Sequence, residues 1–286
     1  MELKHIAARE GRLSSFLRGE LKMSTGLMNK LKWGDSLCVN GTPQRTNFPV
    51  RPGDVITVRL EEEQPEYPPQ DGPLDILYED DYLLVVDKPA GMLIHPSRSK
   101  NDGTLANYVF GYYQKTHQSS AFHPMTRLDR DTFGIVLLAK NAHIHALLQT
   151  VDVRKTYHAL VMSCPDCPEG IIDAPIARLP LPSLLRCVSP EGKPSLTEYT
   201  LLEQNGNISK LALRPITGRT HQLRVHCAYM GFPILGDPQY GSEESRQISE
   251  RLALPYQMLC AHSLEFSHPI TEEPMHLSSR MDVFLP

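Results

Sequence analysis

Four charged residues lie within five positions of the chain, from Arg127 to Asp131, and an apolar run follows them directly. Either aspartate, Asp129 or Asp131, could act as a nucleophile or a base, and an adjacent arginine would stabilise the charged carboxylate. The alternative is an ordinary solvated loop. Spacing does not choose between the aspartates, because residues two apart in an extended segment point the same way.

Other motifs that carry chemistry give little support to a cofactor or a metal. The sequence has no glycine-rich phosphate-binding motif, no HExxH and no GxSxG, so we expect no cofactor. His221 and His226 would lie about 140° apart on a helix and could not share a metal from one face. Cys164 and Cys167 form one CxxC pair, whereas a structural zinc site usually needs a second close pair. We therefore expect reduced, mostly buried thiols, with a metal-stabilised interaction protein as the weaker alternative.

The composition is that of a globular protein of about two domains. The chain has 286 residues, of which 41% are hydrophobic and 22% charged, as is usual for soluble proteins. It contains no apolar run of membrane-spanning length, and its N-terminus lacks the apolar core of a signal peptide. We expect a cytoplasmic protein with no membrane contact.

The charge is unevenly distributed along the chain. The net charge is −4, yet residues 1–60 carry ten Lys/Arg against five Asp/Glu. A basic N-terminal segment on an acidic body is compatible with local contact to phosphates. The net charge argues against a strongly basic nucleic-acid binder.

Residues 1–60 are predicted to form a small α/β domain. Helical apolar spacing is present in residues 12–21 and 25–35, and short strands flank the turns at Asn40-Gly41 and Pro52-Gly53-Asp54. This pattern, over about residues 12–60, resembles the small RNA-binding domain first seen in a small-subunit ribosomal protein. Residues 61–75 follow with four prolines and six acidic residues, which indicates a stiff acidic linker.

Residues 76–286 alternate strand-like and helix-like segments. We expect an α/β body with a mixed, largely antiparallel central sheet and flanking helices. Strands are predicted at residues 82–88, 134–140, 155–162 and 195–204, and helices at residues 104–115, 143–149 and 220–231.

Three motifs in this body, in this order, resemble the RluA family of RNA pseudouridine synthases. They are "LLVVDKPAGMLIHPS" at residues 83–97, "TRLDRDTFG" at 126–134 and "PITGRTHQLRVHCAYMGFPILGDPQYG" at 215–241, with "RKTY" between the last two. The resemblance covers nearly all of residues 75–286. It implies an isomerase that converts specific uridines of ribosomal or transfer RNA to pseudouridine, working as a monomer on RNA and not on DNA. The alternative is a non-catalytic RNA-binding or ribosome-associated protein on the same fold.

The resemblance also assigns the site. It implies Asp129 as the catalytic carboxylate and Arg224 as its ion partner. Arg127 would displace or hold the flipped base, and Tyr157 would stack on the uracil, a contact worth about 1–3 kcal/mol. We expect Lys88 and other residues of the first motif to shape the cleft without taking part in the chemistry.

The chain departs from the family motif at two positions. Thr126 stands where the family usually has His, and Phe133 where it usually has Ser. Thr126 could alter the preferred substrate, and Phe133 requires different local packing. Asp131 is expected to fix the loop by accepting backbone hydrogen bonds.

Overall fold

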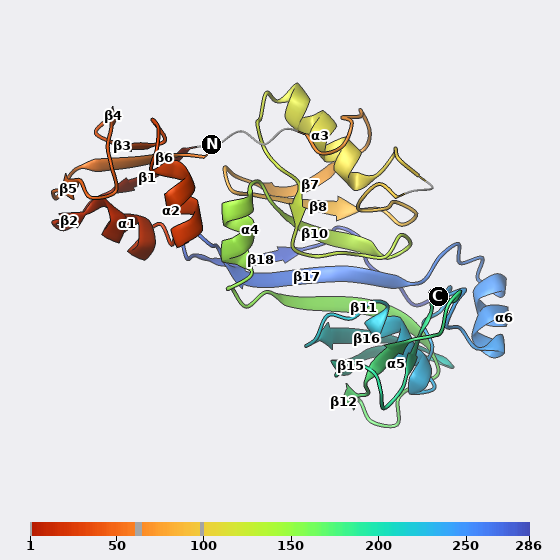
Figure 1. Cartoon of the computed structure of the whole chain (residues 1–286). Helices are drawn as coiled ribbons and strands as arrows, with labels where there is room; N and C mark the ends of the chain where they lie inside the picture. Colours follow the sequence, from red (N-terminus) through yellow and green to blue (C-terminus); the bar gives the residue numbers. More distant parts are fainter. Residues whose placement is uncertain (1, 61–64, 98–99) are drawn as a thin grey trace.

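The computed structural model describes residues 2–60, 65–97 and 100–286. Two main sheets organise these residues, a small one near the N-terminus and a ten-stranded one in the remainder of the chain (Figure 1). Within the described residues, no helix is long and apolar enough to cross a membrane.

The N-terminal unit is a four-stranded sheet covered by two short helices. Its strand order is β1-β6-β3-β4, and β1 pairs with β6, more than 45 residues further along the chain. The helices place Leu13, Phe16 and Leu17 in a hydrophobic core that belongs to this unit. The elements are β1 (Glu2–Ile6), β2 (Gly11–Arg12), α1 (Leu13–Gly19), α2 (Thr25–Leu31), β3 (Leu37–Val39), β4 (Thr42–Pro43), β5 (Pro49–Val50) and β6 (Val55–Arg59).

The large sheet runs in the order β12-β15-β16-β11-β17-β10-β8-β7, with β18 paired to β17 and β9 to β10. Its elements are β7 (Asp75–Glu79), β8 (Leu83–Lys88), α3 (Leu105–Lys115), β9 (His123–Pro124), β10 (Phe133–Ala139), α4 (Ala142–Leu148), β11 (Arg154–Met162), β12 (Glu169–Asp173), β15 (Leu196–Asn205), β16 (Ile208–Pro215), α5 (Gln222–Tyr229), α6 (Glu243–Arg251), β17 (Leu259–Ser267) and β18 (Pro274–Ser278). A separate hairpin is formed by β13 (Ile176–Arg178) and β14 (Arg186–Val188).

The sheet is mixed and largely antiparallel, as predicted. Only the β10–β17 pair is parallel among the described strand pairs of this sheet. Gly134 lies in this pair with φ of +106°, and a Cβ at this position would collide with the carbonyl oxygen of Ala261. The junction therefore requires glycine for two reasons, its backbone conformation and the close approach of β17.

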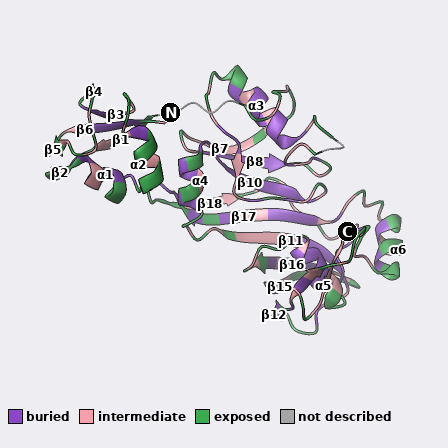
Figure 2. Cartoon of the chain, viewed as in Figure 1, coloured by how far each residue is buried: buried purple, intermediate pink, exposed green. Residues whose placement is uncertain are grey.

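Both faces of the central strands are buried, which explains the continuous apolar runs in the sequence (Figure 2). Leu84 and Val136 belong to the core under α3, whereas Val85 and Ile135 belong to the core under α4. A third core lies between α5 and strands β11, β15 and β16. The strands that flank the chemistry-bearing loop are thus held from both sides.

The predicted linker differs from expectation in its second part. Residues 61–64 lie outside the described residues, but Gln70 docks on α3. Its backbone N–H donates to Asn107 O over 3.0 Å, and Asn107 Nδ2 donates to Pro68 O over 2.9 Å. A Cβ on Gly111 would strike the carbonyl of Gln70. Residues 68–70 are therefore packed against the large unit rather than forming a free spacer.

The helices and strands predicted for the body are all present within one or two residues of the expected ends. Several elements were not predicted, among them β1, β7, β12, β16, β17, β18 and α6. The strand β17 matters most, because it lies between β10 and β11 and joins the two halves of the sheet.

Candidate active site

The loop from Thr126 to Thr132 connects β9 to β10 and is fastened at several points. The buried ammonium of Lys88 donates to three carbonyl oxygens, those of Pro89, Met92 and Arg130, at 2.9–3.0 Å. Burial lowers the pKa of Lys88 to about 8. The carbonyl of Arg130 is therefore tied to the segment after β8, and Lys88 shapes the site without facing its cavity.

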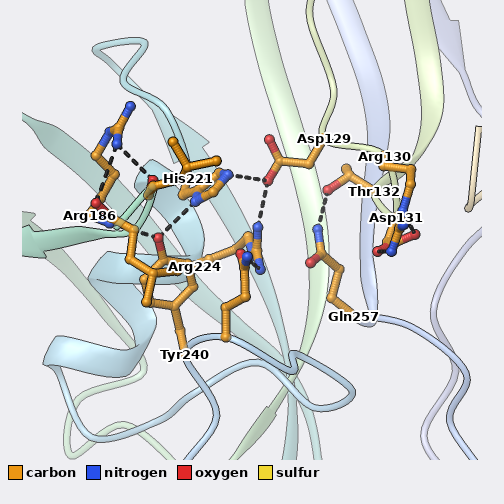
Figure 3. A network of polar contacts seen from close by, with 12 residues as sticks. Asp129, Arg130, Asp131, Thr132, Arg186, His221, Arg224, Tyr240 and Gln257 are labelled. Atoms are coloured by element: carbon orange, nitrogen blue, oxygen red, sulfur yellow. Dashed lines mark hydrogen bonds and ion pairs between the residues drawn. The ribbon is translucent and has the colours of Figure 1, made fainter. Parts of the chain in front are cut away.

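A second tie comes from the segment that precedes β17. Gln257 Nε2 donates to Thr132 Oγ1 over 2.6 Å, and both residues are buried (Figure 3). The backbone N–H of Thr132 also donates to the carbonyl of Asp129 over 3.2 Å. These contacts fix the backbone on which Asp129 stands.

Asp129 and Arg224 are brought together from positions 95 residues apart. Arg224 Nη1 donates to Asp129 Oδ2 over 2.9 Å (Figure 3). The arginine side chain is 5% exposed and the aspartate side chain 31% exposed. Arg224 thus approaches from the protein interior, while the carboxylate keeps an open side for a substrate.

Arg224 is itself held by Asp237, a residue for which the sequence suggested no role. Its Nε and Nη2 donate to the two carboxylate oxygens of Asp237 over 2.7 and 2.8 Å, and Nη2 also donates to Gln239. Burial alone would lower the pKa of Arg224, but the hydrogen bonds and charge of Asp237 outweigh it and raise the pKa. The guanidinium therefore stays charged and fixed in orientation.

His221 and Tyr240 complete the surroundings of the carboxylate. Tyr240 OH lies 2.7 Å from His221 Nδ1 and accepts the backbone N–H of Arg186. His221 Nε2 lies 3.8 Å from Asp129 Oδ2. Burial lowers the pKa of His221, which favours a neutral imidazole beside this carboxylate.

A cavity of about 600 Å³ opens over these groups. A volume of this size is typical of a small-molecule or nucleotide site. Asp129, Arg127 and Tyr157 all line the cavity, and Arg224 lies at its wall. The structure therefore brings together all four residues predicted for the site.

Tyr157 is partly buried in β11 and packs against the hydrophobic cores on both sides of it. Burial raises the pKa of its hydroxyl, with a further contribution from Asp129. The phenol therefore stays neutral, and its ring is available as an apolar surface for a base.

Asp131 does not play the part expected from the sequence. Its carboxylate accepts two hydrogen bonds from the Arg130 guanidinium, at 2.9 and 2.8 Å, instead of bonds from the backbone. Arg130 is exposed, and this pair points away from Asp129 in Figure 3. The fixing of the loop falls to Lys88 and Gln257.

The two departures from the family motif have structural explanations. Thr126 is buried, and its Oγ1 accepts the backbone N–H of Leu137 over 3.1 Å, so a short hydroxyl closes the loop onto β10. Phe133 is buried in a cluster with Leu160 and Cys260 and meets the ring of Tyr256 edge-on at 5.9 Å. The larger side chain thus fills space between β10 and the segment before β17.

Among the described residues, the CxxC pair belongs to no cluster that could hold a metal. Cys164 is half-buried and Cys167 exposed, so the expectation of buried thiols fails for both. Within the described residues, only His158, His262 and Asp282 place three ligand atoms close enough for an ion. The Asp282 carboxylate there already accepts from Lys210 and lies 2.8 Å from His158 Nδ1.

The fold and the site together define an RNA-modifying isomerase, and comparisons with known proteins agree. The RNA pseudouridylate synthase family model matches residues 82–229, and the chain belongs to this family. An RNA pseudouridine synthase of Bacillus subtilis, YjbO, which carries the description uncharacterized, is 37% identical over 90% of this chain and 91% of its own length. The ribosomal large subunit pseudouridine synthase D of Xanthomonas campestris is 36% identical over 87% of this chain and 78% of its own.

A solved structure shows the same relationship. Human RNA Pseudouridylate Synthase Domain Containing 1 is 26% identical, with a TM-score of 0.59 over 74% of this chain and 91% of that one. The protein is therefore an RNA pseudouridine synthase.

Proposed function

We propose that the protein isomerises uridine in large-subunit ribosomal RNA, with Asp129 as the catalytic carboxylate. The contact between Asp129 and Arg224 at the cavity wall carries this proposal. It orients one carboxylate oxygen and leaves the other side of the carboxylate open to the substrate. The choice of ribosomal RNA over transfer RNA rests on the names of relatives that are 36% identical.

The reaction needs no external reactant. The N1–C1′ bond of uridine breaks, a C5–C1′ bond forms, C5 loses a proton and N1 gains one. A charged carboxylate next to the ribose and the base can serve as nucleophile or base in this exchange. Asp129 fits either path, because it is the carboxylate that lines the cavity within the described residues.

Arg127 and Tyr157 are proposed to hold the uridine outside the RNA stack. Removing a base from the stack costs a few kcal/mol, and two contacts offset this cost. Arg127 is exposed at the cavity rim and can stack where the base was, while the Tyr157 ring supports the uracil.

We propose that the protein acts as a monomer in the cytoplasm, where ribosomal RNA is found. Light scattering of the purified protein at micromolar concentration should give the mass of one chain, 32.2 kDa.

The function is tested by mapping pseudouridine in total RNA with and without the gene. We expect at least one site of large-subunit ribosomal RNA to be lost on deletion and restored by the wild-type gene, but not by Asp129→Asn. Full restoration by Asp129→Asn would refute the catalytic assignment and favour a non-catalytic RNA-binding protein. Loss of a transfer-RNA site alone would refute the proposed substrate.

A further inference from the structure

Lys155 lies in the cavity wall and has no role in the chemistry described above. It stands on β11 two residues before Tyr157, and both side chains line the cavity. Since residues two apart in a strand point to the same face, they form a pair roughly 6.5 Å apart along the strand. The neighbouring Arg154 points to the other face, where it pairs with Asp152.

The ammonium of Lys155 has no partner within the part of the chain that the structure describes. No hydrogen bond or ion pair reaches its Nζ, unlike Lys88, Lys140 and Lys210, which are all bonded to carbonyl or carboxylate oxygens. Desolvation lowers the pKa of Lys155, and no nearby charge opposes it. Lys155 is half-buried and lines the cavity, so its ammonium is available to an anionic group of a ligand that enters there.

The substrate offers one kind of anion. Uracil and ribose are neutral, whereas a phosphodiester adjoins the flipped nucleoside on each side. Asp129 does not neutralise Lys155, because its carboxylate is bound to Arg224. A cation placed beside the stacking ring would meet the backbone of the same nucleotide.

We propose that Lys155 binds a phosphodiester next to the flipped uridine and so positions the nucleotide between Tyr157 and Asp129. This inference rests on the proposed function, because it assumes that uridine in RNA enters the cavity. Lys155 is a positioning residue in this scheme, and the contact is specific for RNA backbone rather than for sequence.

The test compares the affinities of protein variants for a fluorescent RNA of seven nucleotides, in which six adenosines surround one central uridine. Three versions are compared: all phosphodiester, and a neutral methylphosphonate at either the 5′ or the 3′ linkage of the uridine. Affinity is measured for the full chain carrying Asp129→Asn, so that the probe is not converted. Lys155→Met and Lys155→Arg are introduced separately, with Arg154→Gln on the opposite face as the matched control.

We expect Lys155→Met to weaken binding of the all-phosphodiester probe about tenfold. It should have no effect on the probe whose contacted linkage is already neutral, and the position of that linkage identifies the phosphate. Lys155→Arg should retain most of the affinity. Neutralising one phosphate contact should also reduce the salt-dependence slope by about 0.7 for a single strand, and Arg154→Gln should affect all three probes equally and weakly.

An equal loss with all three probes would overturn the proposal, since Lys155 would then act on the base or on the fold. Absence of binding to every probe by the Asp129→Asn chain would overturn it as well. The result of this binding experiment is independent of the result of the pseudouridine mapping. If Asp129→Asn restores pseudouridine in cells while the binding experiment still shows a linkage-specific loss, the catalytic assignment fails and the phosphate site stands.

Discussion

Asp237 holds the Arg224 guanidinium through two hydrogen bonds of 2.7 and 2.8 Å, and both side chains are buried. The arginine that contacts the proposed catalytic carboxylate is therefore positioned before any substrate arrives. Orientation of this kind lowers the reorganisation needed in the reaction. Arg224 thus joins two carboxylates, of which Asp129 lines the cavity and Asp237 is buried.

Asp237→Asn should lower kcat about 100-fold with little change in KM, because Arg224 loses its charged support while the lining of the proposed RNA-binding cavity is kept. Breaking a buried ion pair should also cost about 3 kcal/mol of unfolding free energy. Single-turnover pseudouridine formation and urea denaturation measure the two effects. Asp166→Asn, the same change at an exposed position, is the control and should alter neither, and an unchanged rate in Asp237→Asn would contradict the positioning role.

Gly134→Ala should destabilise the protein by about 3 kcal/mol or more, because a Cβ meets the Ala261 carbonyl and the backbone has φ of +106°. Gly206→Ala is the matched control, with φ of +56° and open space around the Cβ position, and should cost about 1 kcal/mol. Thermal unfolding distinguishes them. Equal losses would mean that the contact with β17 is not the cause.

The lowered pKa of Lys88 predicts that the free energy of unfolding rises with pH. Its pKa falls from 10.5 to about 8 on folding, so between these values the unfolded chain binds more protons than the folded one. The unfolding free energy should therefore increase from pH 8 to pH 10.5, by at most about 3 kcal/mol. Urea denaturation of the wild type and of Lys88→Met over this range isolates the effect. A wild type that gains no stability relative to the variant would contradict a pKa lowered by burial.

We propose that the N-terminal unit, residues 1–60, is an independent RNA-binding domain. We predict that Trp33 of this unit contacts RNA. Its ring is 69% exposed, with Lys32 and Arg45 about 5.3–5.4 Å from its centre. Because it is the single tryptophan of the chain, its fluorescence should be quenched when RNA binds. Trp33→Ala should weaken binding by about 1–3 kcal/mol and leave the melting temperature unchanged.

A control for this experiment is Phe284→Ala, which removes another highly exposed ring near a lysine. It should leave RNA affinity unchanged. Binding of RNA without a change in Trp33 fluorescence would show that the N-terminal unit makes no stacking contact.

Sequence reasoning reached Asp129 and Arg224 because both stand in long, ordered motifs. Asp237 lay in the same motif but received no role. Its partner is decided by the turn after α5, at Gly231 and Gly236, which brings the chain back under Arg224. The Gly236-Asp237 pair could have indicated a role for Asp237. The sequence alone does not show that the turn brings its carboxylate to Arg224.

Two of the missed strands, β1 and β17, share a physical cause. β1 becomes a strand through pairing with β6, and β17 through pairing with β10 and β11. Their local patterns are short or weak, whereas the partners lie 49 to more than 100 residues away. The buried strands β8 and β10 were predictable because both of their faces are apolar.

The late strand β17 has a consequence for how the enzyme is made. It lies between β10, which follows the Asp129 loop, and β11, which carries Tyr157. A growing chain on the ribosome therefore cannot align these two halves until about residue 267 has left the exit tunnel. The enzyme should therefore acquire activity only after β17 has been synthesised, and a chain terminated before residue 267 should be inert toward its RNA substrate.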